Sequence, residues 1–274
     1  MEIKILTFNI WDIPFWFCLN REKRIARLPE FIKKYDPDII CLQESFDTEN
    51  RTLIHNSLGK SIYKAPDNYG KTRRILLYKK FDRSGGLLTL SKFKIKNTNF
   101  RPFKKHPLMS LPERLARKGF LETLLQTPKG PLLVFNIHFV GGVVTKTSKK
   151  IKLAQINMLL ERLKDEKITT IIAGDFNDEA TDEKDNFSRL LEKLGFKNSA
   201  VFLKKTQRPT LRIDNPYTTI LFQIRAGGIS ERWDHVLIKN GNSVQLEVND
   251  VRTLTQPRNP LSDHDPVLAT FKIK

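Results

Sequence analysis

Residues 168–177 read Ile-Thr-Thr-Ile-Ile-Ala-Gly-Asp-Phe-Asn, an apolar, β-branched run that stops at a glycine and is followed by polar side chains. The run predicts a buried strand that ends at Asp175 and Asn177. Side chains two residues apart on an extended chain point to the same side, so a carboxylate and an amide would meet at one point. Such oxygens can hold a hard metal ion, or a phosphate and a water molecule. An ordinary polar turn explains the same residues, since Gly, Asp and Asn are common in turns.

Strand and helix patterns recur on both sides of this stretch. Strand-like residues cover 3–10, 38–43, 74–79, 86–91, 94–100, 119–126, 131–138, 168–174, 233–239, 244–254 and 266–273. Helical spacing of apolar residues predicts helices over 21–35, 148–164 and 183–194, with Ser148 as the N-cap of the second. Residues 127–130 predict a hairpin turn. No linker or repeat interrupts the pattern, so we expect one α/β domain over residues 1–274, with two packed sheets and helices outside them.

The composition indicates a globular chain with a large excess of positive charge. The 274 residues are 39% hydrophobic, with a mean hydropathy of −0.39. No apolar run approaches the roughly 20 residues that cross a bilayer. A net charge of +18, from 48 Lys and Arg against 30 Asp and Glu, predicts attraction to nucleic acid or to an anionic membrane surface. A lysine-rich, merely solvated surface explains the same excess.

Neither the cysteines nor the start of the chain indicates secretion. Cys18 and Cys41 give no disulfide framework and no metal-ligand spacing, so we expect both to be reduced and partly buried. The chain begins with a strand pattern instead of a charged and apolar leader. We expect a cytoplasmic monomer, or a secreted protein if a leader has been trimmed.

Other polar side chains stand beside apolar strands, as Asp175 does. Asn9, Glu44 and His138 end such strands, Asp263 and His264 precede the strand at 266–271, and Asp234 begins another. Singly, a Glu after a strand is usually solvated, and a lone His in a sheet is usually structural. Sheet edges that meet would gather these groups in one cleft, and their recurrence favours a functional site.

The chemistry of this set predicts hydrolysis of a phosphate ester. Carboxylate and amide oxygens without cysteine suit Mg²⁺ or Mn²⁺ rather than zinc. A metal with adjacent His and Asp can activate water and neutralise charge on a phosphate. One His can accept the proton of water, and the other can donate to the phosphate oxygen or the leaving group. An Asp bonded to the basic His would fix its tautomer.

A series of short motifs resembles the endonuclease/exonuclease/phosphatase superfamily in content and in order. The pieces are Thr-Phe-Asn-Ile-Trp (7–11), Leu-Gln-Glu (42–44), Gly-Leu-Leu-Thr-Leu-Ser-Lys (86–92), Asn-Ile-His-Phe (136–139), Gly-Asp-Phe-Asn (174–177), Trp-Asp-His-Val-Leu (233–237) and Ser-Asp-His-Asp-Pro-Val (262–267). The resemblance spans nearly the whole chain. It implies a four-layered α/β sandwich with two mostly antiparallel sheets, and Mg²⁺-dependent hydrolysis of phosphate esters.

The same resemblance implies a role for each residue of the set. Glu44 is similar to the principal metal ligand, with Asn9 and Asp263 beside it. Asp175 and Asn177 resemble the pair that positions water, metal and phosphate. His264 resembles the general base, and Asp234 resembles its orienting partner. His138 is similar to the histidine of deoxyribonuclease-like and sphingomyelinase-like members, whereas abasic-site endonucleases commonly have tyrosine there.

Two pieces look like the neutral sphingomyelinase branch of this superfamily. They are Trp-Asp-Ile-Pro (11–14) and Arg-Lys-Gly-Phe-Leu (117–121). In that branch an Asp precedes the lysine by five positions and can engage it as a switch; here Glu113 precedes Lys118. A surface cation in a basic segment is the simpler explanation of Lys118. Asn215 and Tyr217 stand where the superfamily places polar groups on the substrate side.

We expect the substrate to be a sphingomyelin-type phospholipid, cleaved between its phosphate and its ceramide-like alcohol, and a DNA or RNA nuclease is the main alternative. The motif pieces favour a sphingomyelin-type phospholipid, and the net charge favours a DNA or RNA nuclease. The aromatic stretch 11–17 fits a lipid interface, a packed core or single-stranded nucleic acid. A non-catalytic basic binding module is a third possibility, although a pure binder has no need of so many buried acids.

Overall fold

The computed structural model describes residues 1–14, 18–66, 73–75, 78–82, 84–141, 146–177, 192, 194–202, 208–218 and 230–274. The aromatic residues 15–17 and most of the helix expected over 183–194 lie outside them. The helices are α1 (Arg21–Tyr35), α2 (Thr48–Leu58), α3 (Leu111–Ala116), α4 (Lys146–Leu163) and α6 (Ser199–Phe202). The strands are β1 (Glu2–Asp12), β2 (Ile39–Ser45), β3 (Tyr63–Lys64), β4 (Arg73–Ile75), β5 (Tyr78–Phe81), β6 (Leu88–Ser91), β7 (Lys94–Pro102), β8 (Gly119–Thr127), β9 (Gly130–His138), β10 (Thr170–Asp175), β11 (Lys197–Asn198), β12 (Asp234–Lys239), β13 (Leu246–Thr253) and β14 (Val267–Ile273).

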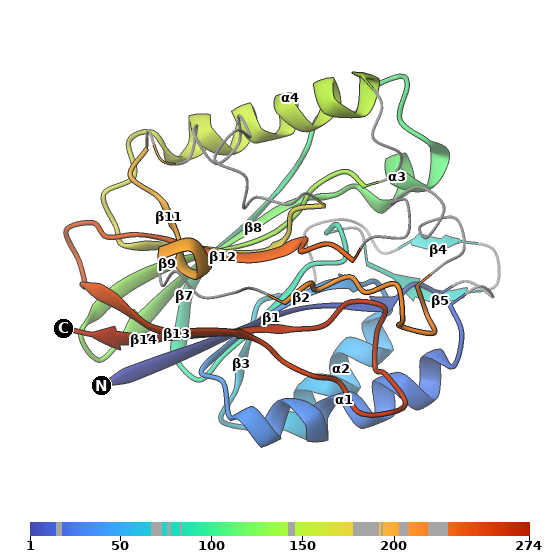
Figure 1. The fold of residues 1–274 in the computed structure, drawn as a ribbon, viewed down its shortest axis with the longest axis horizontal. Helices are drawn as coiled ribbons and strands as arrows, with labels where there is room; N and C mark the ends of the chain where they lie inside the picture. Colours follow the sequence, from blue (N-terminus) through green and yellow to red (C-terminus); the bar gives the residue numbers. More distant parts are fainter. Residues whose placement is uncertain are drawn as a thin grey trace.

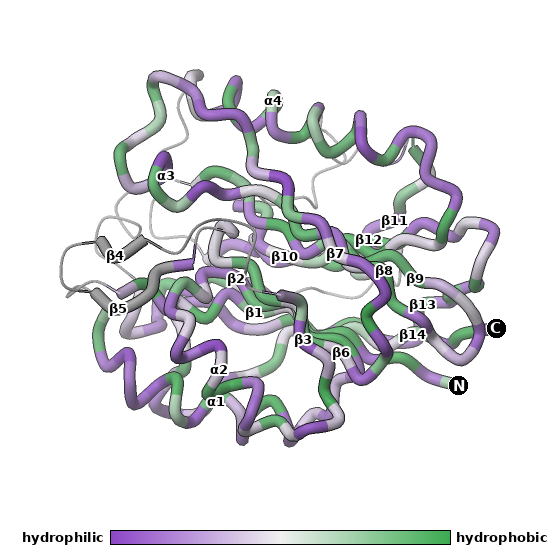
Figure 2. The backbone as a smooth tube through the Cα atoms, turned by 180° about the vertical axis from the view of Figure 1, so that it is seen from behind, coloured by the Kyte–Doolittle hydropathy of each residue, from purple (hydrophilic) through white to green (hydrophobic). Residues whose placement is uncertain are grey.

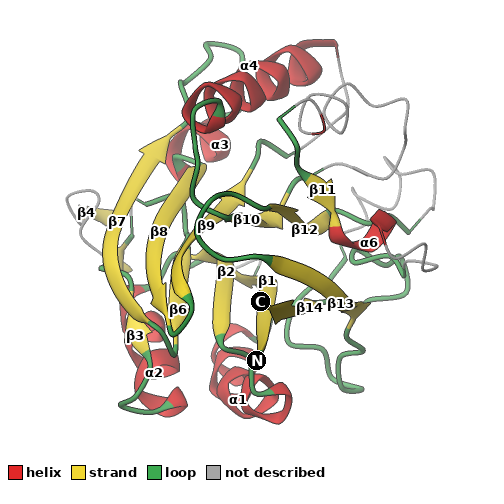
Figure 3. Cartoon of the chain, turned by 90° about the vertical axis from the view of Figure 1, so that its left-hand side faces the viewer, coloured by secondary structure: helices red, strands yellow, loops and turns green. Residues whose placement is uncertain are grey.

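Two six-stranded sheets share one pattern. The first sheet has the order β13-β14-β1-β2-β6-β3, and the second has the order β11-β12-β10-β9-β8-β7 (Figure 3). Each has a parallel pair at its centre, β1 with β2 and β10 with β9, and antiparallel neighbours elsewhere. The expectation of two mostly antiparallel sheets is therefore confirmed.

Apolar clusters hold the layers together. Side chains from β1, β2, β9 and β10 meet between the sheets, among them Ile5, Cys41, Val134 and Ile171. Figure 2 shows apolar residues recurring along these strands. The outer face of the first sheet packs against α1, and the outer face of the second packs against α4. The order helix, sheet, sheet, helix is the expected four-layered sandwich (Figure 1).

Some boundaries differ from the sequence-based prediction. The segment expected as one strand over 74–79 forms two strands, β4 and β5, which pair with each other. Helix α4 begins at Lys146, two residues before Ser148, so the predicted N-cap is wrong. Helix α2 was not predicted because only two of its residues, Arg51 and Ile54, are buried, which leaves no apolar stripe. The turn at 127–130 and the buried, free cysteines are confirmed.

The topology brings strand ends from both sheets to one place. Parallel neighbours end at the same edge of a sheet, and in open sheets such an edge is where ligands bind. Strand β14 runs antiparallel to β1, and β12 runs antiparallel to β10, so both begin at the edge where β1 and β10 end. A hydrogen bond of 2.9 Å from Nδ2 of Asn9 to Oδ2 of Asp175 joins the two edges.

Candidate active site

Glu44 occupies an unusual backbone conformation at the end of β2. Its φ is +53°, and Trp11 on the neighbouring strand has a φ of +48° beside an irregular register between Asn9 and Asp12. Left-handed φ is unfavourable for a residue with a Cβ, by about 1–2 kcal/mol. Bulges and such strain recur next to active sites because they aim a side chain. Here they accompany the carboxylate that the sequence marked as the principal metal ligand.

Asp175 lies at the centre of the polar cluster. Its Oδ1 accepts a hydrogen bond of 2.8 Å from N of Asn177, and its Oδ2 accepts from Asn9 and lies 3.3 Å from Nε2 of His138. Burial raises the pKa of Asp175, but the histidines His138 and His264 outweigh burial, so the pKa is below its usual value. Asp175 is therefore an ionised, fully partnered carboxylate in a buried place.

His264 and Asp234 form an oriented pair. Nδ1 of His264 lies 2.8 Å from Oδ2 of Asp234, and Nε2 lies 3.9 Å from Oδ2 of Asp175. Burial lowers the pKa of His264, but the carboxylates of Asp234 and Asp175 outweigh it and hold the pKa well above its usual value. Because Asp234 holds Nδ1, Nε2 is the nitrogen that can exchange a proton.

His138 has the opposite electrostatic character. It is 1% exposed, and its Nδ1 is buried without a hydrogen-bond partner among the described residues. Burial lowers the pKa of His138 well below its usual value, and the nearby ammonium of Lys118 lowers it further. The ring is therefore neutral at neutral pH, so the two histidines differ in protonation because only His264 is paired with Asp234.

The carboxylates of Glu44 and Asp263 fit a hard cation. Burial, and then the neighbouring charge of Asp263, raise the pKa of Glu44 to about 7. Burial also raises the pKa of Asp263. Within the described ranges the Glu44 carboxylate makes no hydrogen bond, and it lies 3.9 Å from Nε2 of His138. Two like charges of this kind, with the amide oxygen of Asn9, make an oxygen donor set that suits Mg²⁺ or Mn²⁺.

A second combination of groups has metal-like spacing. Asp175, Asp234 and His264 each bring one atom within 4.8 Å of the others. Asp234 and His264 are already joined to each other by the hydrogen bond that orients the imidazole. Neither Glu44 nor Asp263 is tied to a histidine by a hydrogen bond of this kind among the described residues, so these two carboxylates are the better candidates for a cation site.

Lys118 and Glu113 meet at the rim of the site. Nζ of Lys118 lies 3.0 Å from Oε1 of Glu113, and the same oxygen accepts a hydrogen bond of 3.2 Å from N of Gly141. Lys118 is only 8% exposed. Burial lowers the pKa of Lys118, but Glu113, Glu44 and Asp175 outweigh it and raise the pKa. Lys118 is therefore a buried cation of the site, and its interpretation as a surface charge is wrong.

Three other expected residues lie near the site with their side chains engaged. Nδ2 of Asn215 donates to the carbonyl oxygens of Ser262 and Asp263, so Asn215 lies under the Asp263 loop rather than on an open substrate side. The hydroxyl of Tyr217 accepts from Asn20 at 3.3 Å. Asn177 follows the end of β10 with a φ of +49°, so the extended-strand argument does not apply to it. Its Nδ2 donates to the carbonyl oxygen of Phe139.

Sequence reasoning did not identify the residues whose hydrogen bonds hold the strands and loops of the site in place. Nε2 of Gln43 donates to Oδ1 of Asn136 at 2.7 Å, which ties the first sheet to the second. Oγ of Ser262 donates to the carbonyl oxygen of Asn9 at 2.6 Å. Arg24 is 1% exposed and donates to the carbonyl oxygens of Ile10, Trp11 and Leu261. Ser262 stands inside a recognised motif, but no local pattern distinguishes Arg24 from the other arginines.

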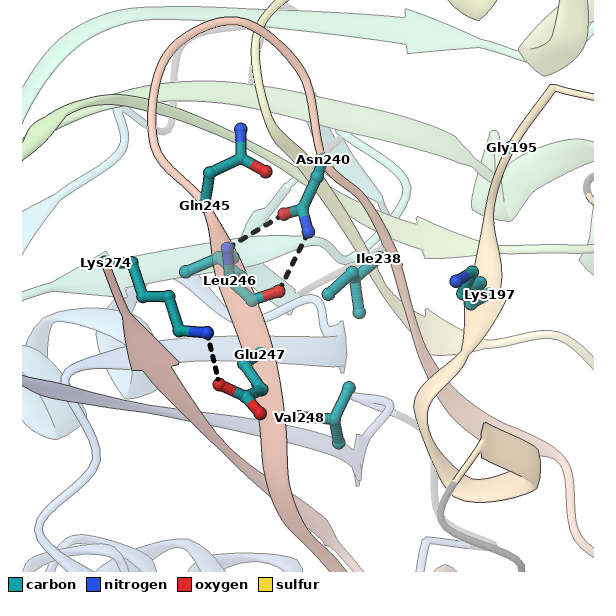
Figure 4. A pocket seen from close by; sticks show the side chains of 9 residues that line it. All are labelled: Gly195, Lys197, Ile238, Asn240, Gln245, Leu246, Glu247, Val248 and Lys274. Atoms are coloured by element: carbon teal, nitrogen blue, oxygen red, sulfur yellow. Dashed lines mark hydrogen bonds and ion pairs between the residues drawn. The ribbon is translucent and has the colours of Figure 1, made fainter.

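A separate hollow lies at the opposite end of β12 from Asp234. Its lining includes Lys197, Ile238, Asn240, Glu247 and Lys274 (Figure 4). Lys274 pairs with Glu247 at 2.9 Å, and the side chain of Asn240 bonds to the backbone of Leu246. This hollow contains no His and a single carboxylate that is already paired, so it offers no counterpart to the chemistry at the other end.

Comparison with known proteins places the chain in a family. Residues 6–264 match the model of the Endonuclease/Exonuclease/phosphatase family, and the chain belongs to this family. The *Drosophila melanogaster* protein named "Putative neutral sphingomyelinase" is 23% identical over 294 residues, which cover 100% of this chain and 61% of that protein. The chain thus spans less than two thirds of that relative.

Solved structures agree on the fold. Beta toxin from Staphylococcus aureus, as an F277A, P278A mutant with bound magnesium ions, has a TM-score of 0.68 at 17% identity, with 98% of this chain and 99% of that one covered. TDP2 of D. rerio, complexed with a single strand DNA product, has a TM-score of 0.69 at 15% identity, with 99% of each chain covered. The family match and these likenesses place the chain among the Endonuclease/Exonuclease/phosphatase proteins by sequence and by fold.

Proposed function

We propose that this chain is a Mg²⁺-dependent phosphodiesterase that hydrolyses a sphingomyelin-type phospholipid between its phosphate and its ceramide-like alcohol. The observation that carries the reaction is the buried His264–Asp234 pair beside Asp175. It presents an oriented proton acceptor among carboxylates, as metal-assisted hydrolysis requires.

In this proposal, water attacks phosphorus in line with the leaving alcohol. In its uncharged form, His264 takes the proton of the water at Nε2, while Asp234 holds Nδ1 and stabilises the charged ring that results. Asp175 and Asn177 position the water and the phosphate. The bond from phosphorus to the alcohol oxygen breaks, and the electron pair of the bond stays on that oxygen, which takes up a proton from the solvent. The N–H of neutral His138 donates a hydrogen bond to the phosphate or to the leaving oxygen.

Glu44, Asp263 and Asn9 would hold Mg²⁺, or Mn²⁺ in its place. When bound, the ion supplies positive charge that offsets the charge developing on the phosphate. Lys118, buried at the rim, adds a fixed cation to the same region. Both charges suit an anionic phosphodiester.

The choice of a lipid is supported by the sequence and by one comparison. The pieces at 11–14 and 117–121 look like the neutral sphingomyelinase branch, and the Drosophila relative carries that name. Glu113 and Lys118 of the second piece meet beside the acid and histidine cluster. A nuclease is the second candidate, because a net charge of +18 suits a nucleic acid.

The test offers the purified protein two substrates with Mg²⁺: sphingomyelin in detergent micelles, and plasmid DNA. We expect release of phosphocholine and an intact plasmid. Glu44→Gln should lower hydrolysis by at least about a hundredfold, the upper end of what loss of an outer-shell partner causes at metal sites. Mg²⁺ should raise the melting temperature of the wild type and not that of Glu44→Gln. The matched control is Glu49→Gln, an exposed residue of α2.

Each other outcome changes a specific part of the proposal. Cleavage of DNA alone would replace the lipid by a nucleic acid. Full activity of Glu44→Gln, or a melting temperature that still responds to Mg²⁺, would remove Glu44 as a metal ligand. No cleavage of either substrate with Mg²⁺ or Mn²⁺ would overturn the proposal.

A further inference from the structure

Residues 104–117, the rim segment, connect β7 to β8 and expose large apolar side chains. Leu108 is 70% exposed, Leu111 is 66% exposed and Leu115 is 46% exposed. Both ends of the segment are anchored: N of Phe103 donates to the carbonyl oxygen of Lys118 at 2.9 Å, and the buried Phe103 ring stacks on Phe139. Between the anchors, three leucines remain in water although the chain has an apolar core.

Helix α3 separates an apolar side from a side that faces the site. Leu111 and Leu115 are four residues apart, so they lie on one face of the helix, and Leu108 lies in the turn just before the helix. Glu113 lies on a different face, where its carboxylate meets Lys118 and the backbone of Gly141. The leucines therefore face outward at the border of the candidate active site.

The rim segment is also strongly basic. Its cations are Lys104, Lys105, Arg114 and Arg117, and its single acid is Glu113. Lys104, Lys105 and Arg114 are exposed and form no ion pair with any described acid. Glu113 is engaged by Lys118, so it does not offset the exposed cations. Exposed leucines interleaved with cations are the composition of surfaces that lie on anionic bilayers.

We propose that the rim segment docks on an anionic lipid bilayer and presents the cleft to the membrane. The proposal rests on the lipid substrate proposed above and names the surface from which that substrate would be taken. Leu108, Leu111 and Leu115 enter the interface between headgroups and acyl chains, while Lys104, Lys105 and Arg114 contact anionic headgroups. Lys118, at the end of the segment, then lies between the membrane and the buried acids.

Nucleic acid is a poorer occupant for this surface. Proteins that bind single strands stack bases on aromatic rings, and the rim segment contains no Phe, Tyr or Trp. Its leucines would gain nothing from a phosphate backbone. A bilayer satisfies both the leucines and the cations.

Vesicle sedimentation with EDTA tests the docking without any hydrolysis. The vesicles contain phosphatidylcholine alone or with about a quarter phosphatidylserine, which gives the surface its negative potential. The variants replace Leu108, Leu111 and Leu115 by Ser together, or Lys104, Lys105 and Arg114 by Glu together. The controls are Leu53→Ser on α2, which is 43% exposed, and the joint change of Lys23, Arg27 and Lys33 on α1 to Glu. Melting temperatures verify that each variant is folded.

We expect the wild type to bind vesicles with phosphatidylserine, and each rim variant to bind them at least about tenfold more weakly. The Leu53 variant should bind like the wild type. The α1 charge control should lose much less than the rim charge variant, although both change the net charge equally. Equal binding by the rim leucine variant and the wild type, equal losses in the two charge variants, or no binding by the wild type would overturn the docking.

The outcomes also separate this docking from the proposed activity. Intact vesicle binding without cleavage of sphingomyelin would overturn the activity alone. Cleavage of sphingomyelin in detergent micelles, together with unchanged vesicle binding of the rim variants, would overturn the docking alone.

Discussion

Single residues of this protein are charged in places where burial opposes charge. Asp12, at the end of β1, is a clear case outside the acid and histidine cluster. Its Oδ1 accepts hydrogen bonds from Arg21 on α1 at 2.7 Å and from Asn50 on α2 at 2.9 Å. Its Oδ2 is buried and has no hydrogen-bond partner in the part of the chain that the structure describes. Burial raises the pKa of Asp12 from 3.8 to about 6, although Arg21 lowers it; the nearby charge of Asp47 raises it further.

Asp12→Asn should therefore change how stability depends on pH. A pKa raised in the folded state stabilises the fold below the unfolded value, and the benefit is lost as pH rises through about 6. Relative to Asp12→Asn, the wild type should lose roughly 2–2.5 kcal/mol of unfolding free energy between pH 4 and pH 7, at about 1.4 kcal/mol per pKa unit. Urea unfolding of both proteins across this range measures the difference. Parallel pH curves would show that the pKa of Asp12 is not raised.

For single residues, the sequence predicted the chemical type of a site residue better than it predicted which residues surround it. It marked Asn9, Glu44 and Asp175 because each follows an apolar run. It could not show that Asn215 is occupied by the Asp263 loop, because the partners lie 47 and 48 residues away. It could not show that Lys118 is buried, because the charges of Glu44 and Asp175, which act on Lys118 in the fold, come from distant strands.

Among the elements, the end of β2 depends on close packing against the turn before β6. Gly86 has a φ of +69°, and a Cβ there would lie 2.9 Å from the Phe46 ring and 3.0 Å from Cα of Glu44. The missing side chain of Gly86 therefore lets the turn pass directly against the backbone of Glu44. This contact helps to fix the strained end of β2.

Gly86→Ala should destabilise the protein by roughly 2–4 kcal/mol, from left-handed strain and from overpacking together. Gly195→Ala is the matched control: its φ is +82°, and a Cβ there would meet nothing within 4 Å. The control should lose only about 1–2 kcal/mol, the cost of the backbone conformation. Denaturant unfolding compares the two variants. Equal losses would mean that the packing against Glu44 and Phe46 relaxes freely.

Element prediction succeeded where the apolar pattern was strong. Helix α1 was predicted with the correct bounds because Ile25, Leu28 and Ile32 form one stripe against the first sheet. Helix α2 was missed because only two of its residues are buried, so no apolar stripe marks it. Its N-cap Asp47, which accepts from N of Glu49 and of Asn50, is a helix-start signal that the sequence does contain.

On the scale of the whole molecule, the net charge of +18 predicts long-range attraction to polyanions. Among the described residues no helix has the length and apolar character to cross a membrane. Attraction between separated surface charges is screened beyond roughly 10 Å at 0.1 M salt.

If the charge serves a polyanionic partner, binding to plasmid DNA in EDTA should weaken at least about tenfold between 50 and 200 mM NaCl, as counterion release predicts. In the same salt series, binding to vesicles that contain phosphatidylserine should weaken less. The rim leucines contribute to that binding by entering the bilayer, and this contribution does not respond to moderate salt. Fluorescence anisotropy with labelled DNA, and sedimentation with vesicles, measure the two curves. If the affinity for DNA did not change with salt, the net charge would reflect only the composition of the surface and would not indicate a polyanionic partner.

The sequence by itself determined the layered α/β class, the order of the motifs along the chain and the chemical types of the site residues. These follow from local patterns: apolar period, turn residues and polar side chains at strand ends. Only the tertiary structure decided that Asn9 meets Asp175, that Asp234 orients His264, and that Lys118 lies buried beside them. The physical reason is that each of these contacts joins strand ends or loops of different elements, and their distances are set by how the two sheets pack. The stretch at 168–177 predicts a carboxylate at the end of a strand, but the partners of that carboxylate come from the rest of the chain.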